Sequence, residues 1–231
     1  MPDWRDALWR LFEADLFDAP STDRLFNPYR DAHPAHDGPE AAALRRANLR
    51  AALDATPGRP EMLVVAEAPG PWGCRFSGVP FTNERQLLDP AFPLGGTPTS
   101  AQFAASGEPV TEYSGSIYWA AMLPHWGRFW TWNTVPLHPH RPGEPLTIRT
   151  PGVREARAWH GLLRGVVDAL DPEAVVAVGR KAEAALAAVG AEAVYVRHPS
   201  QGGATAFREG IAQVWKRIGE GHFGRPGKSR S

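Results

Sequence analysis

The sequence contains a single cysteine, Cys74, among its 231 residues. One cysteine excludes an intrachain disulfide and any metal or iron–sulfur site built from four cysteines. It also fits a reducing compartment, and the N-terminus lacks the basic start of a signal peptide, so we expect a cytoplasmic protein. No apolar run approaches the roughly 20 residues needed to cross a bilayer, and no membrane partner is expected.

The sequence also has no net charge, because its 25 Lys and Arg residues balance its 25 Asp and Glu residues. This balance argues against bulk electrostatic attraction to nucleic acid but allows a local basic face. Residues 197–231 indicate such a face, since seven Lys and Arg there stand against two Glu. Residues 223–231 are expected to be a disordered basic tail. The 43% hydrophobic content predicts a single folded domain in residues 1–222.

Predicted strands and helices alternate along most of the chain. Short apolar runs and helical periodicity predict strands at 62–66, 129–135, 174–178 and 193–196, and helices at 3–17, 39–55, 116–126, 152–170, 179–189 and 204–218. This alternation predicts a three-layer α/β/α sandwich with a central four-stranded parallel sheet. The 23 Gly and 23 Pro predict much ordered loop, including an irregular segment at 94–108 with a turn at 95–98.

Three of the predicted strands end in polar residues. Glu67 follows the first strand and opens a loop rich in Gly and Pro, Asn133 lies in the second strand near its end, and His198 follows the fourth. Because the carboxyl ends of parallel strands meet at one edge of a sheet, we expect these side chains to share a crevice. A glutamate can orient a water, an amide can read an amide-like edge, and a histidine can donate to a developing anion. Together they suit hydrolysis with an anionic leaving group.

Each of these residues also has a purely structural interpretation. Glu67 could cap a loop, Asn133 could close a turn, and His138 and His140 could be surface histidines. The last two lie two residues apart and have no carboxylate or cysteine at ligand spacing, so no metal site is expected. The loop after the first strand lacks the P-loop ending Gly-Lys-Ser/Thr, and no Gly-x-Gly-x-x-Gly opens a helix after a strand. The sequence contains no Gly-x-Ser-x-Gly elbow.

The motifs resemble those of the uracil-DNA glycosylase superfamily. Residues 67–70, Glu-Ala-Pro-Gly, resemble the first motif of its family 4 enzymes. The continuation Gly-Pro-Trp-Gly, followed by Ser-Gly-Val-Pro-Phe ending at Phe81, resembles the single-strand-selective monofunctional glycosylases. Trp-Asn-Thr-Val-Pro-Leu around Asn133 and His-Pro-Ser at residues 198–200 resemble the other two motifs. The resemblance spans about residues 62–207.

The resemblance implies an enzyme of base excision repair that flips uracil out of DNA and hydrolyses its N-glycosidic bond. It implies that Phe81 stacks on the uracil, that Asn133 reads its amide edge and that His198 stabilises the departing base. The remaining pocket is expected to be formed by Ala68, Pro69 and Gly70. Contacts with DNA are expected from Pro71, Lys181, Ser200, Gln201, Gly202, Gly203 and Ala204.

The chain departs from the family pattern in three ways. Ala68 stands where the founding families have a catalytic Asp or Asn, so we assign water activation to Glu67, with Asn83 as a second candidate. Family 4 enzymes hold an iron–sulfur cluster on four cysteines, which Cys74 alone cannot provide, so no cofactor is expected. Residues 201–203, Gln-Gly-Gly, are smaller than a typical wedge, which argues against strong penetration of a duplex.

The leading hypothesis is a monomeric, monofunctional uracil-DNA glycosylase acting on single strands and on U:G or U:A pairs. A monofunctional enzyme is expected because no lysine lies in the three motif loops to form a Schiff base. A hypoxanthine- or xanthine-DNA glycosylase of the same fold remains an alternative, since pocket contacts set base choice. Ala68 also leaves open a non-catalytic binder of damaged or single-stranded DNA. A third alternative is an α/β protein that binds a small nucleobase or nucleotide.

Overall fold

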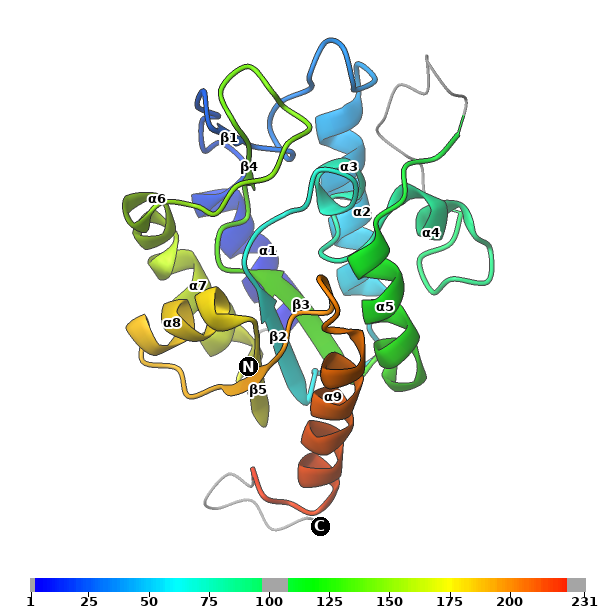
Figure 1. The fold of residues 1–231 in the computed structure, drawn as a ribbon, viewed down its shortest axis with the longest axis vertical. Helices are drawn as coiled ribbons and strands as arrows, with labels where there is room; N and C mark the ends of the chain where they lie inside the picture. Colours follow the sequence, from blue (N-terminus) through cyan, green and yellow to red (C-terminus); the bar gives the residue numbers. More distant parts are fainter. Residues whose placement is uncertain (1–2, 97–107, 224–231) are drawn as a thin grey trace.

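A central sheet of four parallel strands organises the computed structural model, which describes residues 3–96 and 108–223. The strand order is β3-β2-β5-β6. The strands are β2 (Met62–Ala66), β3 (Phe129–Asn133), β5 (Ala174–Val178) and β6 (Val194–Val196). Helices cover both faces of this sheet (Figure 1), so the predicted three-layer α/β/α sandwich is confirmed.

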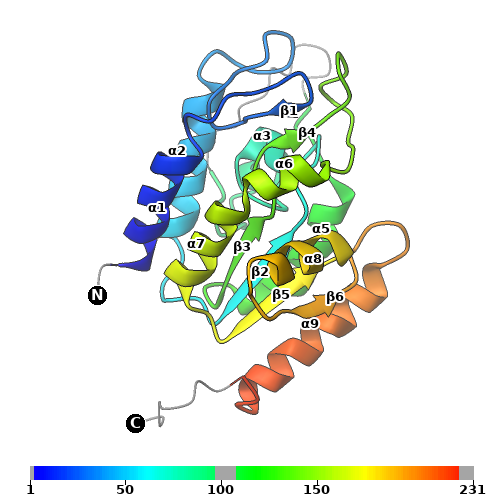
Figure 2. The same cartoon turned by 90° about the vertical axis from the view of Figure 1, so that its left-hand side faces the viewer.

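The helices divide between the two faces of the sheet (Figure 1). One face is covered by α1 (Trp4–Asp15), α7 (His160–Leu170) and α8 (Arg180–Ala188), and the other by α5 (Tyr113–Met122) and α9 (Ala204–Gly219). α2 (Ala41–Asp54) runs beside α1 (Figure 2). The chain passes from β2 to β3 through α5 and returns from β3 to β5 through α7, on the opposite face. Connections that run in opposite directions on opposite faces share one handedness.

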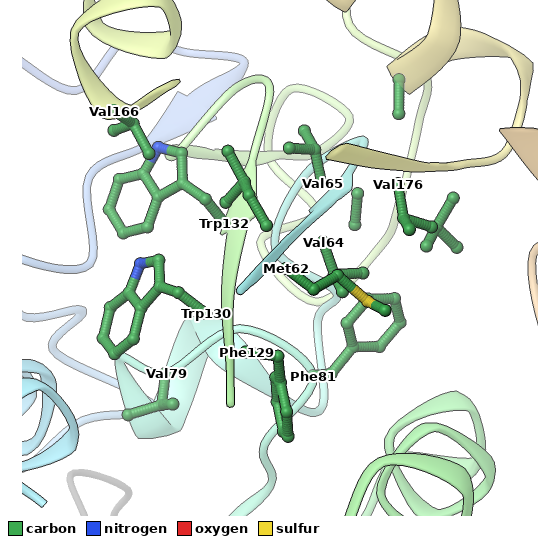
Figure 3. Packing of buried hydrophobic residues seen from close by; sticks show 14 of the residues in the cluster. Met62, Val64, Val65, Val79, Phe81, Phe129, Trp130, Trp132, Val166 and Val176 are labelled. Carbon is green, nitrogen blue, oxygen red and sulfur yellow. The ribbon is translucent and has the colours of Figure 1, made fainter. Parts of the chain in front are cut away.

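The central strand β2 and its edge neighbour β3 are buried because helices cover both of their faces. Every residue of β2 and β3 is buried. Trp130 and Trp132 lie on one side of β3, whereas Phe129 and Phe81 lie on the other (Figure 3). Phe12 of α1 stacks on Trp132 with ring centroids 4.4 Å apart. The N-terminal helix is therefore part of the core and not an appendage to it.

Two predicted helices differ from the observed ones. The helix predicted at 152–170 is divided into α6 (Val153–Ala158) and α7, because Trp159 leaves the helical conformation (φ −102°, ψ 3°) and buries its ring. The helix predicted at 116–126 begins at Tyr113, three residues earlier. It passes after Met122 into the 3-10 turn η1 (Leu123–His125), which contains a proline in its first turn.

The sequence analysis missed four short elements. They are β1 (Leu25–Phe26), α3 (Cys74–Ser77), α4 (Glu84–Leu88) and β4 (His138–Pro139). β1 and β4 pair antiparallel in a second, two-stranded sheet. Elements of two to five residues offer too few positions to show a periodicity.

Some predictions lie outside the described residues. These are the tail at 223–231, apart from Phe223, and most of the irregular segment at 94–108 with the second half of its turn. In the ranges 3–96 and 108–223, no helix is both long enough and apolar enough to cross a membrane.

Candidate active site

A pocket of about 610 Å³ opens at the carboxyl edge of the sheet. It is lined by the segments that follow β2, β3 and β6, by the start of α5 and by residues 148–150. Glu67, Phe81, Asn133 and His198 all line it, as do Ala68, Pro69 and Gly70. The pocket lies where the connections leave β2 in opposite directions, the usual ligand position in an open α/β sheet.

Sheet register places Glu67 beside Asn133. The last residue of β2, Ala66, pairs with Asn133, so Glu67 follows immediately at the edge. The Thr134 amide donates to the Ala66 carbonyl at 2.8 Å, and the Val135 amide donates to the Glu67 carbonyl at 3.0 Å. These two hydrogen bonds follow directly on the β2–β3 pairing, but the chain turns there. The strand predicted to reach residue 135 therefore ends at Asn133.

The Glu67 side chain lines the pocket and is half-buried. Among the residues that the structure describes, its Oε1 is buried without a hydrogen-bond partner. Burial raises the pKa of Glu67, whereas the charge of Lys181 and a hydrogen bond with Thr150 act to lower it. A carboxylate held in this way can orient and polarise a water molecule.

His198 is held as a neutral donor. The Ser200 amide donates to His198 Nδ1 at 3.2 Å, and Ser200 Oγ lies 2.8 Å from the same nitrogen. A ring nitrogen that accepts a backbone N–H carries no proton, so the neutral ring is protonated at Nε2. Burial lowers the pKa of His198, and the charge of Arg197 lowers it further. The Nε2–H is therefore available to donate in the pocket.

Phe81 presents a fixed aromatic face. Its ring stacks on Tyr118 of α5, with centroids 4.3 Å apart and planes 4° apart, and the Tyr118 hydroxyl bonds to Thr131 of β3. The backbone of Phe81 has φ +55°, a left-handed conformation that non-glycine residues seldom adopt outside constrained sites. Gly115 allows this approach, because a Cβ there would collide with the Phe81 carbonyl oxygen. One ring face is thus braced, and the ring also lines the pocket.

Asn133 and Cys74 meet on the pocket wall. Asn133 Nδ2 lies 3.9 Å from Cys74 Sγ, a contact that engages only one part of the amide. Burial raises the pKa of Cys74 to about 12, so the thiol stays protonated and is a poor nucleophile. The amide remains the group on this wall that can read a ligand by hydrogen bonds.

Glu112 is a pocket residue that the sequence analysis missed. It is the N-cap residue of α5, and its carboxyl group crosses to the loop after β2. A Cβ on Gly70 would collide with Glu112 Oε1, and a Cβ on Gly73 would collide with Oε2. Two glycines in the motif loop hint at a close approach, but they do not reveal which residue approaches. The other lining residues that the sequence analysis did not assign to the site are Ala66, Cys74, Ser114, Ile148, Arg149, Thr150 and Arg197.

The carboxyl group of Glu112 is easily protonated. Burial raises its pKa to about 7, and a hydrogen bond with Ser114 acts in the opposite direction. Near neutrality this side chain therefore exists in both the charged and the neutral form.

Asn83, the second candidate for water activation, lies outside the pocket lining. Its Oδ1 accepts the Gln86 amide at 3.1 Å, and the Gln86 side chain accepts the Asn83 amide at 2.9 Å. This capping box begins α4. Asn83 Nδ2 lies 3.5 Å from the Glu112 carbonyl oxygen, so the residue joins the start of α4 to the start of α5.

The predicted DNA-contacting residues divide into two groups. Pocket lining includes Pro71, Ser200 and Gln201, whereas Lys181, Gly202, Gly203 and Ala204 lie outside it. Gln201 and Gly202 are exposed and have consecutive left-handed conformations (φ +52° and +76°), so they form a tight turn beside the pocket. Lys181 is exposed on the first turn of α8.

His138 and His140 are buried, which corrects their interpretation as surface histidines. His138 Nδ1 lies 2.8 Å from the Pro69 carbonyl oxygen, and Nε2 lies 3.1 Å from that of Pro145. Burial lowers the pKa of His138 to about 4, so the ring is neutral. A neutral ring has a single N–H, so it donates to one of these two carbonyl oxygens while it packs between the loop after β2 and the loop after β4. Within residues 3–96 and 108–223, no three His, Cys, Asp or Glu side chains form a group that could hold a metal ion.

Comparison with known proteins agrees with this geometry. The crystal structure of wild-type Pedobacter heparinus SMUG2 matches with a TM-score of 0.67 and 15% sequence identity, over 95% of this chain and 100% of that one. No curated protein matches the sequence significantly. The model of the uracil DNA glycosylase superfamily matches residues 53–218, which include all four strands and the pocket loops. Members of that superfamily are hydrolases that act on DNA. The chain therefore belongs to the uracil DNA glycosylase superfamily, as its motifs predicted.

Proposed function

We propose that this chain is a monofunctional uracil-DNA glycosylase, which hydrolyses the N-glycosidic bond of uracil in DNA. The observation that carries the proposal is the convergence of four groups in one pocket: a carboxylate, an amide, an aromatic face and a neutral histidine. They belong to Glu67, Asn133, Phe81 and His198. Each group supplies something that this reaction requires.

Base recognition would use Phe81 and Asn133. A uracil flipped out of the strand would stack on Phe81, whose ring is braced from behind by Tyr118. Stacking of a base on an aromatic side chain contributes about 1–3 kcal/mol. The Asn133 amide offers one donor and one acceptor, which complement an N–H and a carbonyl oxygen on the uracil edge.

Bond cleavage would use His198 and Glu67. As the N-glycosidic bond breaks, the sugar becomes positive and the uracil leaves with the electron pair as an anion. The Nε2–H of His198 donates to the developing negative charge on a uracil carbonyl oxygen. Glu67 orients the water that attacks the anomeric carbon, and its negative charge stabilises the positive sugar. Ala68, which has no polar side-chain atom, can do neither.

DNA would be bound along a rim of positive charge. Arg149 lines the pocket, but its guanidinium forms an ion pair with Glu155. Arg197 also lines the pocket, and Lys181 is close enough to influence Glu67. These cations would hold phosphates. The turn at Gln201 and Gly202 carries no bulky side chain to enter a duplex, so we expect single strands and weak pairs to be preferred.

The composition of the pocket lining supports the monofunctional part of the proposal. No lysine belongs to the lining of the described pocket, so no amine is in place to form a Schiff base with the sugar. The product would be an intact abasic site, which breaks only after treatment with alkali.

A single-turnover assay tests this proposal. The substrate is an end-labelled oligonucleotide with one uracil, used single-stranded and opposite G or A, followed by alkali. We expect the wild-type protein to generate abasic sites, and both Glu67→Gln and His198→Ala to slow release by about 10²-fold or more. Glu13→Gln removes the same charge from an exposed site on α1 and should match the wild type.

The same assay separates the alternatives. Absence of abasic sites on uracil would contradict the proposal. Release of hypoxanthine or xanthine would then identify a glycosylase of different base choice. Tight retention of oligonucleotides without cleavage would identify a DNA-binding protein, and no salt-dependent affinity for DNA would favour a small-molecule binder.

A further inference from the structure

We propose that Glu112 is a further base-contacting residue, which in its neutral form donates a hydrogen bond to a carbonyl oxygen of the departing base. This inference rests on the proposed glycosylase function. It assigns a role to a pocket residue that belongs to none of the motif loops.

Protein contacts fix the position of Glu112. Its carbonyl oxygen accepts the Ser116 amide at 3.3 Å and lies 3.5 Å from Asn83 Nδ2. Its carboxyl oxygens lie over Gly70 and Gly73, where any Cβ would collide with them. The backbone of Glu112 is therefore fixed by hydrogen bonds. Its carboxyl group fits against the motif loop because Gly70 and Gly73 have no side chains.

Cys74 relates this position to the base-reading wall. The Glu112 carboxylate is near enough to Cys74 to raise the pKa of its thiol, although burial is the main cause of that shift. The same thiol lies 3.9 Å from Asn133 Nδ2. Glu112 and Asn133 thus flank one residue of the pocket wall, and both line the pocket. A base that is hydrogen-bonded to the Asn133 amide would therefore also lie close to Glu112.

The charge of the leaving group decides which form of Glu112 is useful. Uracil departs as an anion, so an ionised carboxylate beside it would oppose bond cleavage. A neutral carboxyl group has an O–H donor, which can bind a carbonyl oxygen and stabilise its growing negative charge. Because burial raises the pKa of Glu112 to about 7, the neutral form is available at and below neutral pH. The proton stays on Glu112 throughout, and no covalent bond to the residue forms.

The effect of Glu112 protonation on the rate can be distinguished from the effects of other charged and titratable groups around the pocket and on neighbouring elements. They are Glu67, Cys74, Glu84, Tyr118, Arg149, Lys181, Arg197 and His198. The pKa of His198 is lowered by burial and those of Cys74 and Tyr118 are raised, so none of these three changes charge just above pH 7. Any other group that changed charge just above pH 7 would change the rate of uracil release equally in the wild type and in Glu112→Gln. A decline in rate that this substitution removes is therefore due to Glu112.

The experiment is the single-turnover rate of uracil release from a single-stranded oligonucleotide between pH 5.5 and 9. We expect the wild-type rate to fall about tenfold per pH unit above pH 7, as for any group required in its protonated form. Glu112→Gln retains a neutral donor, so it should keep its rate across this range and exceed the wild type at pH 8.5. Glu112→Ala should lose about 10²-fold at pH 6, and Glu13→Gln should follow the wild-type profile.

Two results would overturn the inference while leaving the proposed function intact. The first is a wild-type rate that does not decline above pH 7. The second is a decline that persists in Glu112→Gln, or a Gln variant as slow as the Ala variant at pH 6. A wild-type protein that releases no uracil at any pH would instead refute the proposed function. The wild-type profile needs no substitution, so the test holds even if Glu112→Ala does not fold.

Discussion

Individual side chains in this pocket are set to different charge states by their surroundings. His198 is neutral because it accepts a backbone amide and is buried, whereas burial raises the pKa of Glu67 and the charge of Lys181 opposes that rise. Glu112 has no such cation among the causes of its shift, and its pKa rises to about 7. Two carboxyl groups with different environments in one pocket can take different roles, one charged and one neutral.

Phe81 offers the most direct test of base stacking. Phe81→Ala should slow uracil release by about 5- to 150-fold, which corresponds to the roughly 1–3 kcal/mol typical of a base–aromatic contact. Single-turnover rates at saturating enzyme measure the effect. Phe92→Ala removes the same ring from the contact with Trp119, whose centroid is 4.7 Å away, outside the pocket. That control should retain the rate per folded molecule. An unchanged rate in Phe81→Ala would exclude stacking as a source of rate.

Gly73 tests whether the place of the Glu112 carboxyl group matters. Gly73→Ala puts a methyl group where Glu112 Oε2 lies, so the carboxyl group must move. A displacement of this size at a reacting centre costs about 10²-fold in rate. Gly58→Ala is the matched control, because nothing lies within 4 Å of its added Cβ. Equal rates at pH 6 for the two variants, with equal urea midpoints, would show that the position of Glu112 is unimportant.

Among the secondary-structure elements, the strands were predictable and the short connections were not. β2 and β5 have their predicted bounds, because continuous apolar runs flanked by loop residues leave little ambiguity. The break at Trp159 depends on where one large ring is buried, which local sequence does not encode. α3 and α4 exist because the loop after β2 packs against α2 and α5, and this packing is a tertiary effect.

The same distinction applies to the candidate site. Glu67, Asn133 and His198 follow or end strands of one sheet, so topology alone brings them together. Glu112 reaches the pocket from a helix start, in a stretch without clear periodicity, and only the three-dimensional fold reveals it. Asn83 was named for its chemistry, but its side chain is engaged by the capping box of α4.

Asn83 is best tested as a helix cap. Asn83→Ala removes the capping box and should lower the free energy of unfolding by about 1 kcal/mol. Asn83→Asp keeps an oxygen that accepts the Gln86 amide, so it should recover most of the stability. Urea denaturation measures both. We expect the rate of uracil release per folded molecule to change by less than that of Glu67→Gln. A loss as large as that of Glu67→Gln would support the other hypothesis, that Asn83 activates water.

Across the whole molecule, the N-terminal segment that precedes the family match supports the site from behind. The Tyr29 hydroxyl donates to the Gly78 carbonyl oxygen at 2.8 Å, immediately before the turn that carries Phe81. Asp37 forms an ion pair with Arg45 of α2 at 2.7 Å and another with Arg75 of α3. The Tyr29 and Arg75 contacts connect the N-terminal segment to the motif loop that follows β2, so this segment helps to position the pocket.

The buried pairs of Asp37 give a prediction about global stability. All three side chains are fully buried, and removing one partner of a buried ion pair costs about 3–5 kcal/mol. Asp37→Asn should therefore lower the urea midpoint strongly at pH 7. Asp54→Asn is the control, because its pair with Arg50 is exposed and contributes at most about 0.5 kcal/mol.

The effect of Asp37 also depends on pH with a defined sign. Burial opposes ionisation of Asp37, but the charges of Arg45 and Arg75 outweigh it and lower its pKa below the ordinary value of 3.8. A carboxyl group with a lowered pKa in the folded state stabilises fully above its unfolded pKa, and that contribution is lost as pH falls through the folded value. The difference in unfolding free energy between wild type and Asp37→Asn should thus be large at pH 7 and smaller at pH 3. A difference that stays constant or grows on acidification would show that the two arginines do not hold Asp37 ionised.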